Sequence, residues 1–270
     1  MNAELAVLLR IASEAARVVM EVYAQPFGVD YKGPQDPVTD ADRRANALIC
    51  ERLEQEFPGV PIVAEESDPA TFSEFRKSDR VFFVDPVDGT REFVDRNGEF
   101  AVMIGLLEGS RAVAAVIDAP ARGDVFAGWV GEGAFCITGG QQRPIHVSDI
   151  ADVTQGRLVG SRSHRGPELE RALARLNPRE ILVMGSAGLK GTLVASAHVE
   201  AYVAPGYAGK RWDACAADAL VTAAGGKLTD THGDPIDYRA ASLSNERGLI
   251  ASNGRVHEAL VHGLAELRHP

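Results

Sequence analysis

Acidic side chains recur in this sequence where short apolar runs end or helices begin. The set comprises Asp42 in VTDAD, Glu65 and Glu66 in AEES, Asp85 and Asp88 in DPVDGT, and Asp213 in RWDACAADAL. Ends of neighbouring strands form ligand crevices in α/β and mixed folds. Several carboxylates in one crevice are stable when divalent cations neutralise them, and oxygen ligands of this kind select Mg²⁺ or Mn²⁺. The joint pattern therefore indicates a divalent-cation site.

Each acidic position also has an ordinary structural interpretation. Asp42 fits the third position of a helix capping box, and Asp213 fits a helix N-cap. Asp85 before a proline is typical of a turn, and the Glu65–Glu66 pair of a solvated loop. Taken singly, these interpretations are favoured, and only the set as a whole favours the metal site.

The elements that must position these residues begin with two helices and a meandering sheet. Apolar residues at helical spacing predict a helix over residues 3–23 and another from Thr39 to about Phe57, with a loop over 28–37 between them. Short apolar runs with turn signals predict strands at 61–64, 81–84, 101–107, 112–119 and 124–130.

From about residue 156, predicted strands and helices alternate. The strands are 158–160, 181–184, 201–203, 227–228 and 248–250, and the helices are 168–176, 189–197, 214–224 and one after Asn253. Alternation of this kind predicts an α/β arrangement. We expect one domain over residues 1–270, with an N-terminal α+β lobe (about 1–150) and a C-terminal α/β lobe (about 151–270).

Composition narrows the classes of partner. The formal net charge of −10 repels nucleic acid phosphates and disfavours a duplex-binding face. The three cysteines are far apart and form no CxxC, which argues against a disulfide framework or a structural zinc site. Since no apolar run reaches about 18 residues and the N-terminus lacks a secretory pattern, we expect a soluble cytoplasmic protein without a membrane partner.

Four motifs together resemble the inositol monophosphatase superfamily, the lithium-sensitive, Mg²⁺-dependent sugar and nucleotide phosphatases. DPVDGT resembles its DPxDGT signature, and WDACAADAL followed by AGG resembles its second signature. AEES and VTDAD resemble its glutamate and N-terminal aspartate elements, and the order and spacing agree over essentially the whole chain. The resemblance implies an α+β and α/β fold, a layered αβαβα sandwich of the sugar-phosphatase type, and metal-dependent hydrolysis of a phosphomonoester.

The resemblance also implies a set of metal ligands for two or three Mg²⁺ ions, with Mn²⁺ as a substitute. One ion would be held by Glu65, Asp85 and the backbone carbonyl of Val87. A second would be held by Asp85, Asp88 and Asp213, and a third, weaker ion by Glu65 and waters. Li⁺ would compete at a weakly held position.

Two catalytic roles follow from the same resemblance. The Thr90 hydroxyl would contact the attacking water, and Asp42 would accept the Thr90 proton. The backbone N–H groups of Gly89 and Thr90 would face phosphate oxygens, since glycine lets the chain come close. Asp42 could still cap its helix because a carboxylate has two oxygens. No covalent nucleophile is needed, so none is assigned to Cys215.

The segment REFVDRNGEF resembles the 3'(2'),5'-bisphosphate nucleotidase branch rather than the inositol monophosphatase branch. By this resemblance Ser161 and His164 lie near the nucleoside. The N–H groups of Ser186 and Ala187, with the charge of Lys190, would meet a second phosphate. The leading hypothesis is removal of the 3'-phosphate of adenosine 3',5'-bisphosphate, a by-product of sulfate assimilation, to give AMP and phosphate.

Two alternatives stay open. One is an inositol or other sugar phosphate phosphatase with the same metals. The other is a catalytically silent protein that senses phosphate, which the complete set of inferred ligands disfavours. On the residues alone, His164 fits a surface position and Lys190 a solvated helix face. The sequence does not distinguish a monomer from a homodimer.

Overall fold

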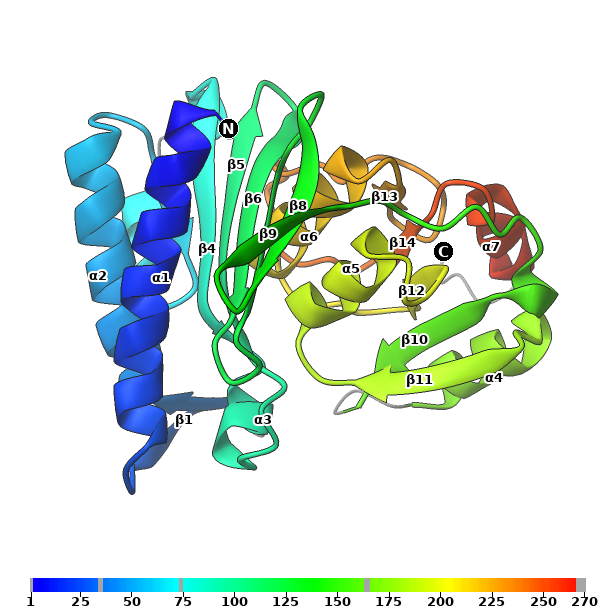
Figure 1. Ribbon diagram of the computed structural model, residues 1–270, viewed down its shortest axis with the longest axis horizontal. Helices are drawn as coiled ribbons and strands as arrows, with labels where there is room; N and C mark the ends of the chain where they lie inside the picture. Colours follow the sequence, from blue (N-terminus) through cyan, green and yellow to red (C-terminus); the bar gives the residue numbers. More distant parts are fainter. Residues whose placement is uncertain (1, 34–35, 73–74, 163–165, 266–270) are drawn as a thin grey trace.

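Helices and sheets alternate in layers (Figure 1). The computed structural model describes residues 2–33, 36–72, 75–162 and 166–265. Its helices are α1 (Ala3–Tyr23), α2 (Asp40–Glu56), α3 (Thr90–Val94), α4 (Pro167–Leu176), α5 (Ala187–Ala195), α6 (Arg211–Ala223) and α7 (His257–Gly263). In this part of the chain, α1 and α2 cover one face of a first sheet, and α5 and α6 separate it from a second sheet. Since α4 and α7 cover the outer face of the second sheet, the predicted αβαβα sandwich is confirmed.

The first sheet carries most of the N-terminal lobe. Its described strands, in spatial order, are β3 (Ile62–Ala64), β4 (Arg80–Asp88), β5 (Ala101–Glu108), β6 (Arg111–Ala119), β7 (Asp124–Trp129), β8 (Gly133–Thr138) and β9 (Gln141–Ile145). β3 and β4 are parallel, and each later neighbour is antiparallel. Because parallel strands end at the same edge of a sheet, the residues after β3 and those at the end of β4 come together.

The second sheet lies in the C-terminal lobe. Its described strands, in spatial order, are β11 (Glu180–Met184), β10 (Arg157–Ser161), β12 (Ala201–Ala204), β14 (Leu249–Ser252) and β13 (Lys227–Thr229). The first three are parallel, as the alternating pattern predicts, and β14 is antiparallel to both of its neighbours. The carboxyl ends of β10 and β11 therefore face the same side, toward the N-terminus of α5.

Several predicted elements were wrong or incomplete. The loop predicted over residues 28–37 contains the antiparallel hairpin β1 (Val29–Gly33) and β2 (Asp36–Thr39). Only Val38 and Thr39 of its strand residues are buried, and each strand is too short to show a sustained apolar alternation. β8, β9 and the short helix α3 were not predicted, and the strand predicted to end at Val84 continues to Asp88.

The apolar core divides among the layers. One buried cluster lies between the first sheet and α1 and α2, one between the two sheets, and one beneath α4 and α7. The middle cluster combines residues of both lobes, such as Phe83 on β4 and Leu220 on α6. The single domain over residues 1–270 stays a prediction. None of the described helices is long and apolar enough to cross a membrane.

Candidate metal and phosphate site

A bulge in β4 places two predicted metal ligands on one face of the strand. Asp85 pairs with Met103, whereas Asp88 pairs with Ala101, so β4 has one residue more than β5 over this interval. In a regular strand, residues three apart point to opposite faces, and one extra residue brings them back to the same face. Pro86 cannot donate a ladder hydrogen bond, which suits it to the bulge.

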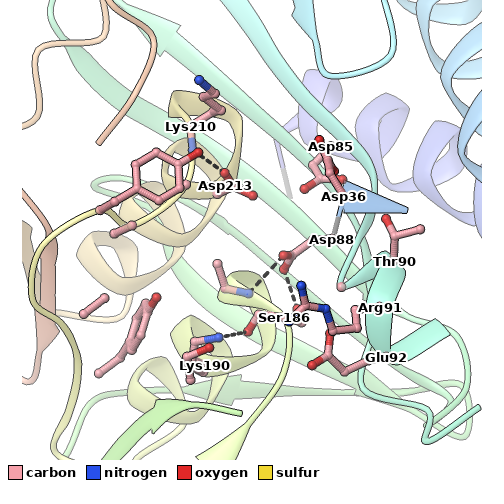
Figure 2. A pocket seen from close by; sticks show the side chains of 18 of the residues that line it. Asp36, Asp85, Asp88, Thr90, Arg91, Glu92, Ser186, Lys190, Lys210 and Asp213 are labelled. Carbon is pink, nitrogen blue, oxygen red and sulfur yellow. Dashed lines mark hydrogen bonds between the residues drawn. The ribbon is translucent and has the colours of Figure 1, made fainter. Parts of the chain in front are cut away.

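The other carboxylates reach the same point from neighbouring elements. Glu65 follows β3, and its N–H donates to the Val84 carbonyl of β4 at 3.1 Å. Asp213 is the third residue of α6 and accepts a hydrogen bond from the Lys210 N–H, the capping-box contact rather than the predicted N-cap. Figure 2 shows Asp85, Asp88 and Asp213 converging from both lobes, and one oxygen of each lies within 4.8 Å of the others.

Burial and mutual repulsion make the carboxylates of this cluster hard to ionise without a cation. Burial, followed by the charge of Glu65, raises the pKa of Asp85 well above its ordinary value. The same two causes raise the pKa of Asp213 to about 8. Burial raises the pKa of Glu65 to about 7, although the Lys32 ammonium acts in the opposite direction. Shifts of this kind mark negative charge that the protein itself does not balance.

The donor set fits a divalent cation. The carboxylate oxygens, together with the nearby carbonyl of Val87, are hard ligands of the type that Mg²⁺ and Mn²⁺ prefer. A bound cation would lower the free energy of the ionised carboxylates and offset the cost of burying them together. Glu65, Asp85, Asp88 and Asp213 are therefore suited to hold such an ion.

Lys32 is a cation of this site that the sequence did not indicate. It lies on β1, and its Nζ donates to Glu65 Oε1 at 2.7 Å and to Glu66 Oε1 at 2.6 Å. Burial lowers the pKa of Lys32, but the two glutamates outweigh this effect and raise it. The solvated-loop interpretation of Glu65 and Glu66 is wrong, because both are partly buried and both bind Lys32.

Thr90 and Asp42 are in contact, as predicted. The Thr90 hydroxyl lies 2.9 Å from Asp42 Oδ1 and 3.0 Å from the Val87 carbonyl oxygen. The other carboxylate oxygen of Asp42 accepts from the backbone N–H and hydroxyl of Thr39, so the capping box also forms. Burial raises the pKa of Asp42, whose exposed fraction is 2 %. One carboxylate oxygen of Asp42 thus contacts the Thr90 hydroxyl, while the other caps the N-terminus of α2.

Gly89 needs to be glycine for two reasons. Its φ is +94°, which is unfavourable for other residues, and a Cβ would lie 2.7 Å from the Glu99 carbonyl oxygen. Gly89 precedes α3, so the N–H groups at the start of that short helix have no helical partner. Gly89 and Thr90 both line the cavity beside the carboxylates. The predicted contact of Gly89 and Thr90 with phosphate stays a prediction.

A cavity of about 970 Å³ extends from the carboxylates into the C-terminal lobe. The wall formed by β10, β12 and α5, called here the far end, is lined by the predicted substrate residues Ser161, Ser186 and Lys190, together with Tyr202. Ser186 also contacts Asp88. His164, also predicted there, lies outside the described residues. The structure thus places three predicted substrate residues on one cavity with the predicted metal ligands.

The N-terminus of α5 binds Asp88. The N–H groups of Ala187 and Gly188 donate to its two oxygens at 3.0 and 2.6 Å, and the Ser186 hydroxyl donates to it as well. The prediction that the Ala187 N–H meets the second phosphate is therefore wrong, because Asp88 occupies it. Ser186 has a φ of +42°, and its hydroxyl also accepts the Leu189 N–H as a helix cap.

Lys190 is buried against this turn rather than solvated on a helix face. Its exposed fraction is 3 %, and Nζ donates to the carbonyls of Gly185 and Ser186 at 2.9 and 2.8 Å. The ammonium lies 5.0 Å from the centre of the Tyr202 ring, a cation–π distance. Burial lowers the pKa of Lys190 to about 8, although Asp88 acts in the opposite direction. The solvated interpretation is wrong.

Comparison with known sequences now decides the family. A sequence model of the inositol monophosphatase family matches residues 2–269. The chain belongs to this family. Within it, the chain is 34% identical over 231 residues to the 3'(2'),5'-bisphosphate nucleotidase CysQ of Escherichia coli O157:H7, which covers 85% of this chain and 91% of that protein.

Solved structures in the inositol monophosphatase family share the fold. The extragenic suppressor protein SuhB from Bartonella henselae superposes with a TM-score of 0.84 at 27% identity, covering 97% of this chain and 98% of that one. CysQ from Bacteroides thetaiotaomicron, described as a bacterial member of the inositol monophosphatase family, gives 0.80 at 27% identity, covering 93% and 97%. The layered fold is therefore that of this family.

Glu99 is a second residue whose place sequence reasoning missed. It belongs to the RNGEF segment that carries the nucleotidase resemblance, yet it is not part of the cavity wall formed by the described residues. Instead it accepts hydrogen bonds from Arg162 and from the Gly185 N–H. A single acidic residue after a glycine gives no sequence signal for partners 63 and 86 positions away.

Proposed function

We propose that this chain is a Mg²⁺-dependent phosphomonoesterase that removes the 3'-phosphate of adenosine 3',5'-bisphosphate, giving AMP and inorganic phosphate. The observation that carries the chemistry is the convergence of Asp85, Asp88 and Asp213 oxygens within 4.8 Å. The nucleotidase names of the relatives support the substrate. A cavity of about 970 Å³ also has room for a nucleotide.

Mg²⁺ held by Glu65, Asp85, Asp88 and Asp213 would lower the pKa of the attacking water and stabilise charge on the phosphoryl and leaving oxygens. The chain's own residues would then accept the proton of the attacking water. Thr90 Oγ can accept a proton from water while its own proton passes to Asp42 Oδ1, 2.9 Å away. Because burial raises the Asp42 pKa, this carboxylate is a better proton acceptor than an exposed one.

The far end of the cavity suits a second anionic group. Lys190 is buried there with an ammonium group whose three donors exceed the two carbonyls that it binds. Ser186 lines the same wall. A buried ammonium of this kind selects a bisphosphate over a monophosphate, because a monophosphate offers it no second anionic partner.

An inositol phosphatase is the second candidate, since the SuhB and inositol monophosphatase structures share this fold. The test is a panel of adenosine 3',5'-bisphosphate, inositol 1-phosphate and fructose 1,6-bisphosphate, each with Mg²⁺, with released phosphate as the readout. We expect kcat/KM for the nucleotide to exceed the others by about tenfold or more, the least that one charged contact provides. A preference for inositol 1-phosphate would favour the second candidate. Binding without turnover of any of the three would favour a phosphate sensor.

A further inference from the structure

An ion pair joins the two lobes beside the cavity. Arg162, the residue after β10, donates from Nε and a terminal nitrogen to the two oxygens of Glu99 at 2.9 and 2.7 Å. Glu99 lies in the segment between α3 and β5, so the contact connects the first sheet to the second. Two parallel N–H···O bonds fix both the distance and the orientation of the partners.

The same carboxylate also binds the chain just before α5. Glu99 Oε2 accepts the Gly185 N–H at 2.6 Å. Burial acts to raise the pKa of Glu99, but Arg162 and the Gly185 N–H outweigh it, so the pKa is lowered. The ionised carboxylate is therefore the form that this geometry favours, and it holds Arg162 and Gly185 at once.

The turn that Glu99 holds is strained and crowded. Ser186 has a φ of +42°, which residues with a Cβ rarely adopt. A Cβ at Gly185 would overlap the Glu92 side chain, so the backbone passes close to α3. Strained turns persist where surrounding contacts over-determine them. Here Lys190 holds the two carbonyls, Asp88 holds the hydroxyl, and Glu99 holds the amide of Gly185.

We propose, on the basis of the proposed function, that Glu99 is a positioning residue for the bisphosphate substrate. With Arg162 it clamps the Gly185–Ser186 turn so that Ser186 and Lys190 stay on the cavity wall where a second phosphate lies. The pair acts through the turn, because neither residue lines the cavity in the described part of the chain. The clamp gives the RNGEF segment a part in selectivity that requires no contact with substrate.

The acidic end of the cavity is anchored mainly by the first sheet, and the N-terminus of α5 adds hydrogen bonds to Asp88. Asp85 and Asp88 lie in β4, which pairs with β5 on one side and β3 on the other. Because β4 holds Asp85 and Asp88 from both sides, loosening the Gly185–Ser186 turn should weaken binding of the second phosphate much more than it slows the bond-breaking step. This separation makes the proposal testable by kinetics.

The experiment compares two substrates that differ by one phosphate, adenosine 3',5'-bisphosphate and adenosine 3'-monophosphate. We expect Glu99→Ala to raise KM for the bisphosphate about tenfold, with kcat and the KM for the monophosphate within about twofold of wild type. Glu99→Gln keeps an acceptor for the Gly185 N–H, so its KM for the bisphosphate should lie close to that of wild type. The KM of Arg162→Ala should lie between those of Glu99→Gln and Glu99→Ala. Arg255→Ala is the matched control, because it removes an exposed ion pair with Asp149 remote from the cavity.

A parallel rise of both KM values in Glu99→Ala would show a general structural role and overturn the proposal. So would a fall in kcat alone, which would place the effect at the acidic end. Amide hydrogen exchange of the peptide over 180–190 tests, without substrate, whether Glu99 holds the turn. This peptide should exchange faster in Glu99→Ala than in wild type and in Arg255→Ala. Equal exchange rates in the three proteins would reject the clamp. If wild type hydrolyses neither nucleotide, the proposed function fails, while the exchange result still decides whether Glu99 holds the turn.

Discussion

The two ends of the cavity handle charge in opposite ways. At the acidic end, burial raises the pKa of Asp85 well above its ordinary value and that of Asp213 to about 8. At the far end, Lys190 binds two carbonyls, and Glu99 just behind the wall binds Arg162. The first end holds excess charge of one sign, whereas the second pairs each charged group with a partner from the chain.

This difference in charge indicates that the acidic end carries out the reaction, whereas the far end determines which substrate binds. Uncompensated buried carboxylates need an external cation, so the acidic end is built to bind a metal and then a phosphoryl group. Charges that the chain already hydrogen-bonds need no ligand for stability, so they fix the shape of the wall, and Lys190 keeps a third donor for a ligand. Substitutions at the acidic end should therefore change the rate and the metal response, and those at the far end the preference among substrates.

The largest effect is expected for Asp213→Asn. The amide oxygen can still accept the Lys210 N–H that Asp213 binds, so α6 should stay capped. Loss of a metal-binding charge should lower kcat about a thousandfold or more. Mg²⁺ should also stop raising the melting temperature, because ligands stabilise only the state that binds them. Full activity and an unchanged Mg²⁺ shift, measured by thermal unfolding, would remove Asp213 from the metal site.

Thr90→Ala tests the proton path at the acidic end with a smaller expected effect. The variant keeps the carboxylates but loses the hydroxyl 2.9 Å from Asp42 Oδ1. We expect kcat to fall about 10²- to 10³-fold, the usual contribution of a positioned proton acceptor, with Mg²⁺ affinity unchanged. Thr90→Ser is the control, since it restores the hydroxyl. If the alanine and serine variants turned over substrate equally fast, Thr90 would have no part in the mechanism.

The sequence predicted the acidic end more completely than the far end, and the reason is local geometry. Asp85 and Asp88 adjoin one apolar run, so their position could be inferred from a strand and a turn. The partners of Lys32 lie 33 and 34 positions away, and those of Glu99 lie 63 and 86 away. Contacts between residues so far apart in the sequence depend on how the layers of the fold pack, and local sequence patterns contain no information about that packing.

Backbone conformation limited the prediction in the same way. Serine at position 186 gives no sign that its φ is +42°, or that its hydroxyl binds Asp88. The short hairpin of β1 and β2 lacks the sustained apolar alternation that marks a half-buried strand. The pattern of amphipathic helices and alternating elements predicted the α/β character of the C-terminal lobe, whereas the layered sandwich followed from the family resemblance.

Lys190→Met probes the far end. We expect kcat/KM for adenosine 3',5'-bisphosphate to fall about tenfold to a hundredfold, because a buried charge that meets phosphate is lost. The monophosphate should change little, so the ratio of the two substrates is the measurement. Burial lowers the Lys190 pKa to about 8, so the wild-type ratio should decline as pH rises through 8 and the ammonium loses its proton. A ratio that is independent of pH, or equal in both proteins, would contradict the charge assignment.

The smallest effect on activity is expected at Asp118, a buried carboxyl away from the cluster. Asp118 lies on β6 and accepts the Ser13 hydroxyl of α1 at 3.5 Å. Burial raises its pKa to about 7 from an ordinary value of 3.8. Between those two values the folded protein keeps the proton that the unfolded chain has lost, so stability falls as pH rises from about 4 to 7 and levels off above.

Asp118→Asn should remove that slope and leave catalysis unchanged. At pH 8 the variant should gain at most about 4 kcal/mol of unfolding free energy relative to wild type, whereas at pH 4 the two should agree. Urea unfolding at both pH values measures this difference. An isolated protonated carboxyl requires no cation to offset its charge. Added Mg²⁺ should therefore leave the contribution of Asp118 to the free energy of unfolding unchanged, whereas it should change the contribution of Asp213. A Mg²⁺-dependent contribution from Asp118 would mean that buried carboxyls alone, rather than their clustering, produce the metal response.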